Sequence, residues 1–438
     1  MKYYIITYGC QMNKSDSERI ASILEKIKYQ PAQKIEEADL IIVNACSVRQ
    51  SAIDRIYGQN KYFNKLKNRN AKLKIILTGC LLNKDKEEMS KIFDFIIDIK
   101  EIAKLPQLIG RKVKLDKNLL ENYFHIEPKY SSKIEAYVPI MTGCNNYCAY
   151  CVVPYTRGPE ISRPAQEIIK EIKNLIKNGY KKITLLGQNV NSYKSEIQNR
   201  NKAKFYKFTK VKKVDFTELI KMINALYGKF WFSFITNHPK DMSERLIKTL
   251  PHLDKFCHYL HLPVQSGSNT ILKRMNRHYT ITSYKKIIKR LRQLLPDLNL
   301  STDIIVGFPG ENEKQFLATK KLMEEIKFDM AYIACYSPRP QTTAFKLNDN
   351  IPYEEKQRRK KILNKILAKT ALENNKKYLA KEMEVLVTNK DPKKKNVFYG
   401  ETKNCKKVAI SSRKNLIGKF IKVKIISAET WGLKGEIL

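Results

Sequence analysis

The chain has 438 residues, a hydrophobic content of 43% and a formal net charge of +40, from 83 Lys and Arg against 43 Asp and Glu. This length allows two or three domains. No run is apolar and long enough to cross a membrane, and the strand-like start YYIIT shows no signal peptide, so we expect a cytosolic protein without a membrane partner.

The number of cysteines and the net charge indicate which kinds of site and partner to expect. Nine cysteines is an odd number in a chain with no secretory signal, and it favours metal binding or catalysis over a disulfide framework. The positive charge favours a polyanionic partner. Drift towards lysine in an A·T-rich genome is the alternative explanation, and the composition leaves both open.

Strand-like and helix-like segments alternate over residues 1–110. Short apolar, β-branched runs predict strands at 2–10, 38–46, 72–80 and 93–99. The polar segments between them predict helices at 16–28 and 50–67. This alternation predicts a small parallel α/β sheet.

Each of the first three predicted strands ends in a cysteine, namely Cys10, Cys46 and Cys80. Because the carboxyl ends of parallel strands lie along one edge of a sheet, we expect the three thiols to meet there. Taken singly, each cysteine is more simply a small buried hydrophobic residue. Their recurrence at one structural position instead predicts a shared metal site.

A polar linker near 111–133 leads to a central region with six further strand-like runs. These runs lie at 137–143, 181–187, 231–236, 258–264, 299–307 and 329–336. Helical segments such as 164–179 and 313–327 separate them. Six βα units predict a parallel, barrel-like sheet that falls short of the eight units of a full barrel.

The loop after the first of these strands reads GCNNYCAYC and places Cys144, Cys148 and Cys151 at CxxxCxxC spacing. Thiolates are the usual ligands of iron–sulfur clusters, and three of them leave one iron of a 4Fe-4S cube open. A structural zinc knot or a disulfide set is the alternative. Zinc knots usually pair two CxxC-like motifs, and no second pair lies nearby in the sequence.

The C-terminal part changes character. A helical stretch at 354–382 precedes β-rich runs at 383–389, 406–412 and 419–429, with glycines at the turns. This pattern predicts a small antiparallel β-barrel, and a basic barrel of this kind suits single-stranded or looped RNA. A basic insertion at 200–213 is explained equally well as a solvated loop or as an RNA contact.

Four segments together resemble the methylthiotransferases, a branch of the radical S-adenosylmethionine (SAM) enzymes, and most closely the MiaB-type tRNA methylthiotransferases. The segments are 7–13, 144–158, 186–193 and 262–268. The resemblance covers essentially the whole chain. It implies an N-terminal methylthiotransferase domain at 1–115, a partial (β/α)6 radical SAM barrel at 130–365 and an RNA-binding TRAM barrel at 376–438.

The resemblance also implies two 4Fe-4S clusters. Cys144, Cys148 and Cys151 would hold the cluster whose open iron takes SAM, which is then split to a 5′-deoxyadenosyl radical. Cys10, Cys46 and Cys80 would hold an auxiliary cluster that carries the sulfur and accepts a methyl group from another SAM.

Residues next to SAM are implied in the same way. They are Tyr150, Gly187, Gln188, Gly307, Phe308 and Gly310. Gln188 follows Gly187 where many radical SAM enzymes carry a Gly-Gly-Glu that meets the amino group of SAM. The glycines of GFPGE at 307–311 would allow a close approach to a flat ligand, although this string alone reads as an ordinary turn. Tyr150 alone reads as a packing residue.

The implied activity is transfer of a methylthio group to carbon 2 of an isopentenylated adenosine at position 37, next to the anticodon of tRNA. The implied partners are the anticodon stem-loop, an electron donor and a sulfur source, and we expect a monomer. Sister families act instead on threonylcarbamoyladenosine in tRNA or on an aspartate of a ribosomal protein. A non-catalytic iron–sulfur RNA-binding protein that senses redox state is a rival of another class.

The chain departs from the family pattern in three places. Ala45 replaces a threonine, Glu401 replaces a basic residue, and the segment 339–344 lacks a glycine and a second proline. The remaining cysteines, Cys257, Cys335 and Cys405, are interpreted as structural, and no role is assigned to His238 or His261.

Overall fold

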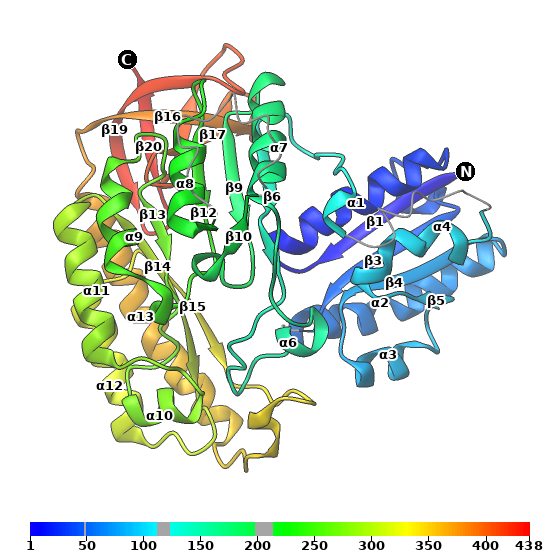
Figure 1. Ribbon diagram of the computed structural model, residues 1–438, viewed down its shortest axis with the longest axis horizontal. Coiled ribbons are helices and arrows are strands. Elements are labelled where there is room, and N and C mark those ends of the chain that lie inside the picture. The colour runs from blue at the N-terminus through cyan, green and yellow to red at the C-terminus, as the bar shows by residue number, and fades with distance from the viewer. Residues whose placement is uncertain (48–49, 112–122, 198–212) are drawn as a thin grey trace. The chain divides into compact units, whose positions relative to one another are not determined.

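A computed structural model describes residues 1–47, 50–111, 123–197 and 213–438 (Figure 1). The basic insertion at 200–213 thus lies outside the described residues except for Lys213. The described chain forms two compact units. One contains 1–132, 141–163 and 339–345, and the other contains 133–140, 164–338 and 346–438. Each unit is described below by itself, and the domain bounds expected from the sequence stay a prediction.

The first unit is built on a five-stranded parallel sheet with the order β2-β1-β3-β4-β5. The strands are β1 (Lys2–Tyr8), β2 (Gln30–Pro31), β3 (Leu40–Cys46), β4 (Lys74–Cys80) and β5 (Phe95–Ile96). The predicted parallel α/β sheet is therefore confirmed. The short strand β2 was not predicted, and β5 is shorter than the predicted run because its flanking residues turn into loops.

Helices and short strands complete this unit. They are α1 (Gln11–Lys26), α2 (Gln50–Arg69), α3 (Asn83–Met89), α4 (Leu105–Leu108), α6 (Val153–Thr156), β7 (Met141–Thr142) and β8 (Ile161–Ser162). The prediction that the first helix begins at Asp16 was wrong, because α1 begins at Gln11. Cys10 is its N-cap, and the Asn13 side chain accepts the backbone N–H of Cys10 at 3.1 Å. This cap starts the helix directly after β1.

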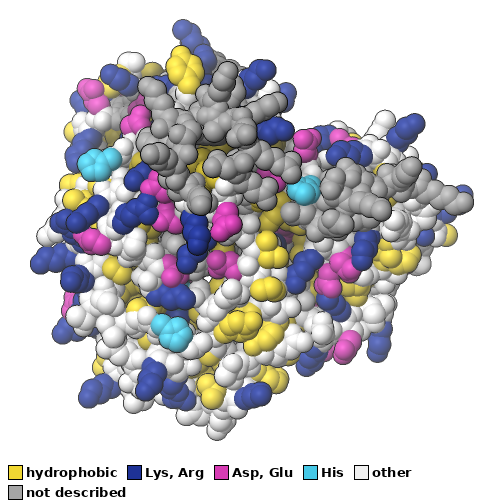
Figure 2. All heavy atoms as spheres, viewed as in Figure 1, with side chains coloured by type: hydrophobic (Ala, Val, Ile, Leu, Met, Phe, Trp, Pro, Cys, Tyr) yellow, Lys and Arg dark blue, Asp and Glu magenta, His cyan; other side chains and the backbone are white. Residues whose placement is uncertain are grey.

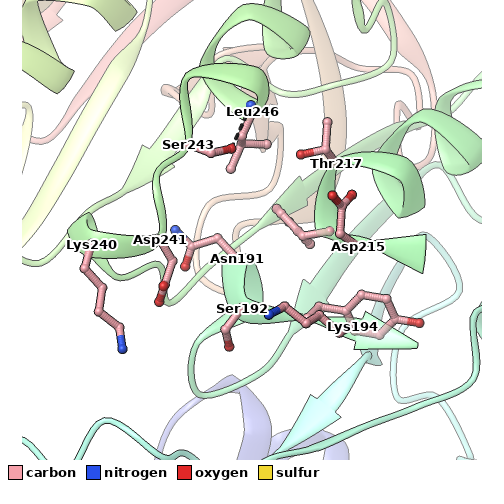
Figure 3. Close-up of a pocket in the computed structure, with 11 residues that line it drawn as sticks. Asn191, Ser192, Lys194, Asp215, Thr217, Lys240, Asp241, Ser243 and Leu246 are labelled. Carbon is pink, nitrogen blue, oxygen red and sulfur yellow. Dashed lines mark hydrogen bonds between the residues drawn. The ribbon is translucent and has the colours of Figure 1, made fainter. Parts of the chain in front are cut away.

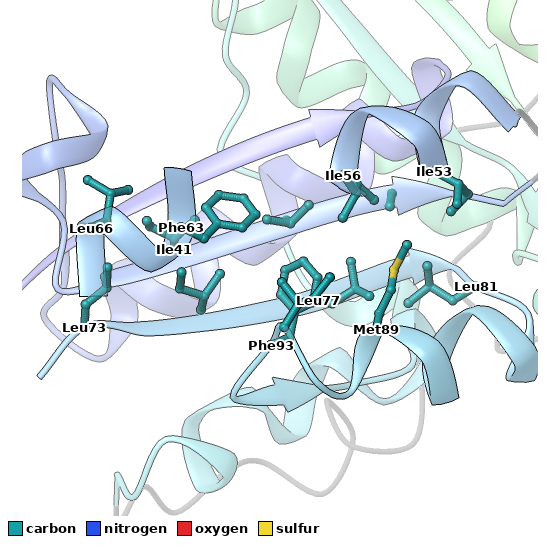
Figure 4. Packing of buried hydrophobic residues seen from close by; sticks show 14 of the residues in the cluster. Ile41, Ile53, Ile56, Phe63, Leu66, Leu73, Leu77, Leu81, Met89 and Phe93 are labelled. Atoms are coloured by element: carbon teal, nitrogen blue, oxygen red, sulfur yellow. The ribbon is translucent and has the colours of Figure 1, made fainter. Parts of the chain in front are cut away.

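The sheet is buried on both faces. On β3, Ile41 and Ile42 point to opposite faces and both are fully buried. Figure 4 shows one face, where Phe63 of α2 packs with Ile41 and Leu77. A strand that is covered on both faces favours apolar residues at successive positions, which is why β3 is continuously apolar from Leu40 to Val43.

The central part of the second unit has six strands in two parallel sets of three, β6-β9-β12 and β13-β14-β15. They are β6 (Glu135–Pro139), β9 (Lys182–Leu186), β12 (Trp231–Phe234), β13 (Tyr259–His261), β14 (Asn299–Val306) and β15 (Met330–Cys335). An isolated parallel bridge joins Phe232 of β12 to Phe256, which precedes β13 in the chain. All six predicted strands are present, which confirms the barrel-like α/β arrangement.

Helices and an antiparallel pair of short strands, β10 and β11, accompany these strands. They are α7 (Ala165–Lys177), α8 (Phe216–Asn224), α9 (Glu244–Thr249), α10 (Asn269–Arg274), α11 (Ile281–Leu294), α12 (Glu313–Ile326), α13 (Tyr353–Lys376), β10 (Lys194–Glu196) and β11 (Lys213–Asp215). None of the helices in the described ranges combines the length and the apolar character needed to cross a membrane.

The C-terminal strands close into a barrel with the order β16-β17-β18-β20-β19. They are β16 (Glu382–Lys390), β17 (Val397–Thr402), β18 (Lys407–Ser411), β19 (Phe420–Glu429) and β20 (Gly432–Ile437). The predicted small barrel is confirmed, with one parallel pair, β18 and β20, among the antiparallel ones. The strands β17 and β20 were not predicted, because their glycines, Gly400, Gly432 and Gly435, were expected at turns. Within the second unit this barrel packs on the six-stranded part. The ring centroids of Trp231 and Phe420 lie 4.9 Å apart at this contact.

Candidate iron–sulfur and cofactor sites

The three N-terminal cysteines come together at the carboxyl edge of the parallel sheet. Cys46 and Cys80 end β3 and β4 and are direct partners in the strand register. Cys10 follows β1 and caps α1. Cys46 and Cys80 are buried, and Cys10 is partly exposed. The sheet thus gathers thiols that are widely separated in sequence.

Asn13 lies among these thiols and is fully buried. Its Oδ1 accepts a hydrogen bond from the Cys10 thiol at 3.4 Å, and its Nδ2 donates to the Ala45 carbonyl at 3.3 Å. The same Nδ2 lies 4.0 Å from the Cys80 sulfur. Asn13 therefore holds the Cys10 turn against the ends of β3 and β4. Sequence reasoning missed this role, although Asn13 lies three residues after Cys10, the usual position of a capping partner.

Gly79, just before Cys80, allows the close packing of these strand ends. Its φ is +118°, and a Cβ atom there would lie 2.0 Å from the Ala45 carbonyl oxygen. Only glycine fits this position. Ala45, one of the departures from the family pattern, is fully buried at this contact.

A cation also faces the N-terminal cysteines. The Arg157 Nε–H donates to the Cys80 sulfur at 3.0 Å, and Nη2 donates to Asp16 at 2.6 Å. A hydrogen bond from Cys46, aided by the charge of Arg157, lowers the pKa of the Cys80 thiol. The thiolate is the form that binds metals.

The second cysteine set lies in one tight loop of the first unit. Gly143 has φ of +77°, and a Cβ atom there would lie 1.9 Å from the Pro159 carbonyl oxygen. The Cys144 N–H donates to the Gly158 carbonyl at 3.2 Å, and the Cys151 N–H donates to the Cys148 carbonyl at 2.9 Å. These bonds fold the CxxxCxxC stretch back on itself, so that its cysteines belong to one compact turn.

Neighbouring residues support this loop. The Ala149 carbonyl accepts a hydrogen bond from the Ala344 N–H at 2.7 Å, so the segment 339–345 packs on the loop within the same unit. Tyr150 is half-buried. Arg339, at the start of the segment that departs from the family pattern, is buried and donates to Gln50.

The side chains of both sets would have to adjust to enclose a metal. Within the described ranges, no three Cys, His, Asp or Glu side chains already lie at distances that would hold a metal ion. The donor sets nevertheless fit iron–sulfur clusters, because each set consists of three thiols held by one edge or one loop. A set of three also leaves one iron position for a ligand that is not protein.

The carboxyl ends of the barrel strands carry the predicted SAM residues of the second unit. Gly187 and Gln188 directly follow β9. Among the described residues, the buried side-chain oxygens of Gln188, Asn189 and Asn237 have no hydrogen-bond partner. A buried acceptor without a donor is costly, so these amides fit a ligand that brings N–H groups, as the amino group of SAM would.

The GFPGE loop after β14 is braced by charged side chains. Glu311 accepts the Gly307 N–H at 2.6 Å and pairs with Arg359 at 2.9 Å, and both charged groups are buried. Gly310 donates its N–H to the Asn350 side chain at 2.9 Å. Phe308 is fully buried and its ring lies 5.2 Å from that of Tyr336. Its side chain thus supports the loop from inside, and Arg359 is a further bracing residue that the sequence analysis missed.

A polar pocket of about 290 Å³ lies beside the loop after β9 (Figure 3). Its lining includes Asn191, Lys194, Asp215, Lys240 and Asp241. It contains none of the predicted SAM residues, although the neighbouring Asn189 donates to Asp241 at 2.7 Å. It is therefore adjacent to the predicted cofactor edge and separate from it.

Two other sequence observations have structural explanations. Glu401, where a basic residue is common in the family, pairs with Lys182 of β9. It therefore serves packing of the C-terminal barrel within the second unit. Burial lowers the pKa of His238 to about 2, and its Nδ1 accepts the Lys240 N–H at 3.2 Å, so this histidine is neutral and acts as a local hydrogen-bond acceptor.

Comparison with protein families divides the chain into three matched segments. Residues 2–99 match the Uncharacterized protein family UPF0004, residues 138–323 match the Radical SAM superfamily, and residues 376–438 match the TRAM domain. A radical SAM domain implies SAM and a 4Fe-4S cluster.

Solved structures with the same fold include radical SAM enzymes. The Kitasatospora setae radical SAM methyltransferase TsrM, with tryptophan substrate and a SAM analogue bound, has a TM-score of 0.55 at 10% identity, over 78% of this chain and 75% of its own. The cobalamin-dependent radical SAM enzyme OxsB has a TM-score of 0.50 at 14% identity, over 83% of this chain and 56% of its own. The present chain thus spans little more than half of OxsB. At these identities the likeness shows the fold alone.

Curated relatives match over the full length. A protein of Dictyoglomus thermophilum is 42% identical over 100% of this chain and 98% of its own. Proteins of Thermoanaerobacter sp. and Clostridium botulinum are each 40% identical, over 100% and 99% of this chain and 92% and 96% of their own. All three are named tRNA-2-methylthio-N(6)-dimethylallyladenosine synthase. The chain belongs to this family of methylthiotransferases within the radical SAM superfamily.

Proposed function

We propose that this protein is an enzyme that places a methylthio group on carbon 2 of N6-dimethylallyladenosine in tRNA. The observation that carries the proposal is the pair of three-cysteine sets, one at a sheet edge and one in a tight loop, in a chain that matches its named relatives over its whole length. This arrangement supports two metal centres with different tasks.

The loop cysteines, Cys144, Cys148 and Cys151, would hold the cluster that binds SAM. When bound, this cluster and SAM supply the radical chemistry that carbon 2 requires, since the hydrogen on that carbon is not acidic enough for an ordinary base. The buried Oε1 of Gln188 would accept a hydrogen bond from the amino group of SAM. Backbone groups of Gly187, Gly307 and Gly310 would border the cofactor, with Tyr150 beside the loop cysteines.

The sheet-edge cysteines, Cys10, Cys46 and Cys80, would hold a second 4Fe-4S cluster. Asn13 orients Cys10, and Gly79 sets the position of Cys80. An intact second set is the feature that distinguishes a methylthiotransferase from a radical SAM enzyme with a single cluster. We propose that the transferred sulfur is held here.

The RNA partner would contact the C-terminal barrel. Lys and Arg side chains are spread over the face in Figure 2 and mixed with acidic ones, so net charge alone does not locate a binding surface.

The loop between β16 and β17 is a more specific candidate for RNA contact. Asp391 accepts the N–H groups of Lys393 and Lys394 at 2.8 and 3.0 Å, and its other oxygen accepts the hydroxyl of the exposed Tyr399 at 2.8 Å. This turn presents three consecutive exposed lysines, ending at Lys395, beside an aromatic ring, as phosphate contact and base stacking require.

We expect the triple change K393E/K394E/K395E to weaken tRNA binding about tenfold or more near 0.1 M salt, because each lost phosphate contact no longer releases counterions. The slope of log affinity against log salt should fall by roughly 0.7 to 0.9 per lost contact. Titration at several salt concentrations measures both.

The matched control is K286E/K289E/K314E, which changes the net charge equally at exposed lysines of α11 and α12. It should bind tRNA with nearly the original affinity. If both triple variants weakened binding alike, the charge would act at long range and the barrel loop would have no special role. Deletion of the whole barrel is a poorer test, because the Lys406–Asp329 ion pair and the contact between Trp231 and Phe420 join it to the rest of the unit.

The activity itself is tested with the purified, anaerobically reconstituted protein, SAM, a reductant and tRNA that carries N6-dimethylallyladenosine. Mass spectrometry of nucleosides should show the 2-methylthio product. A parallel reaction with tRNA that carries threonylcarbamoyladenosine should give none. Product only from the latter tRNA would assign the chain to the sister activity.

A further inference from the structure

Arg157 and Gly158 make contact with one cysteine of each set. The Arg157 Nε–H donates to the sulfur of Cys80, which ends β4, at 3.0 Å. The carbonyl of the next residue, Gly158, accepts the N–H of Cys144 at 3.2 Å. Both contacts lie within the first unit. Two successive residues thus tie the sheet-edge set to the loop set.

The guanidinium is fixed in direction as well as in place. The side chains of Arg157 and Asp16 are 3% and 0% exposed, and they pair at 2.6 Å. Asp16 also accepts the hydroxyl of Tyr123, so the carboxylate is held from another side. Because the N–H groups of a guanidinium lie in one rigid plane, the pairing with Asp16 directs Nε–H at the sulfur.

A purely structural role explains this arrangement poorly. A buried ion pair must recover the desolvation of both ions, and apolar residues of similar volume often serve stability as well or better. An apolar replacement would, however, remove the guanidinium N–H from the Cys80 sulfur, which would keep only its contacts with Cys46 and with Asn13 Nδ2, the latter at 4.0 Å. The feature that needs arginine is therefore the directed N–H group.

We propose that Arg157 is a positioning residue for the N-terminal cysteine site, where it donates a hydrogen bond to the Cys80 sulfur and sets the charge balance of the bound cluster. This inference rests on the proposed function, in which Cys80 is a cluster ligand. Hydrogen bonds to ligand sulfurs and nearby positive charge favour the reduced, more negative state of a cluster, and so raise its reduction potential.

The test uses the full chain with C144A/C148A/C151A, which leaves only the N-terminal set. R157Q removes the charge and the directed N–H, whereas R157K retains a charge that can pair with Asp16. The control is K406M, which breaks another buried ion pair, Lys406–Asp329 at 2.6 Å, in the second unit. Iron content and an EPR-monitored redox titration are measured after anaerobic reconstitution.

We expect R157Q to retain about four irons and to lower the equilibrium constant for reduction at least tenfold, which is a 59 mV more negative potential for one electron. R157K should fall between R157Q and the parent, and K406M should match the parent. Loss of iron from a folded R157Q would also support the positioning role. If R157Q does not fold, a potential shift in R157K decides the question.

Two results separate the inference from the proposed function. If a fully loaded R157Q had the parent's reduction potential and EPR spectrum, the role of Arg157 would be overturned and the cluster site would stand. Where R157Q does not fold, the same result for R157K would overturn the role. An equal shift in K406M would overturn it too. Absence of iron from the parent variant itself would instead overturn the proposed N-terminal cluster.

Discussion

Replacement of Cys144, Cys148 and Cys151 by alanine is expected to abolish both SAM cleavage and formation of the methylthio product. The three thiols are the proposed ligands of the cluster that binds SAM, and no other thiol lies in the 143–158 turn. The loss should be complete, because a radical cannot be generated without this site. The measurements are 5′-deoxyadenosine release and nucleoside mass spectrometry.

Iron content gives an independent reading of the same variant. It should fall from about eight irons per chain to about four, since each set is proposed to hold one 4Fe-4S cluster. The control is C335A, which removes a thiol at the end of a barrel strand that is not a proposed ligand. It should retain all iron and activity. A wild-type chain that held about one zinc and no iron would contradict both sites.

The strands and the cysteine positions were predictable because they depend on local patterns. The strand β3 is apolar at every residue before Asn44 because both faces of the sheet are covered, and this run ends where Cys46 reaches the sheet edge. Parallel pairing then predicts that Cys46 and Cys80 lie at one sheet edge, and the structure shows that they are partners in the strand register. The same reasoning located all six barrel strands.

The start of α1 and the polar contacts around the thiols were not predictable in this way. Helix propensity gives no strong signal over residues 11–15, and the cap depends on where the Asn13 side chain points. Arg157 and Asp16 are separated by 141 positions, and neither has an unusual local sequence. Such pairs depend on tertiary packing, which periodicity does not encode.

In the C-terminal barrel, too, some strands were predictable from the sequence and the pairing was not. Its alternating runs predicted β16, β18 and β19, yet the glycine-containing strands β17 and β20, and the parallel pairing of β18 with β20, depend on how the barrel closes. Glu401 stands where the family commonly has a basic residue, and it pairs with Lys182 inside the unit. A charge in a sequence cannot be assigned to solvent or to an internal ion pair until its partner is known.

The complementary change, C10A/C46A/C80A, is expected to abolish methylthio transfer while SAM cleavage continues. The turn that holds the loop cysteines is closed by backbone bonds, such as that from Cys144 to Gly158, and these do not involve the N-terminal thiols. Arg157 loses its sulfur partner but keeps Asp16. The three truncations should lower the free energy of unfolding by about 1 kcal/mol each, which a folded domain of this size tolerates.

This variant separates the two proposed tasks, because it keeps one cluster and removes the other. We expect about four irons, continued release of 5′-deoxyadenosine and no 2-methylthio product. A circular dichroism melt shows whether the variant is folded, so that loss of product can be ascribed to the missing site. If the folded variant made the product at the original rate, the sulfur would not be held at the sheet edge. Since the only thiols there are Cys10, Cys46 and Cys80 among the described residues, the sulfur would then have to reach carbon 2 from elsewhere.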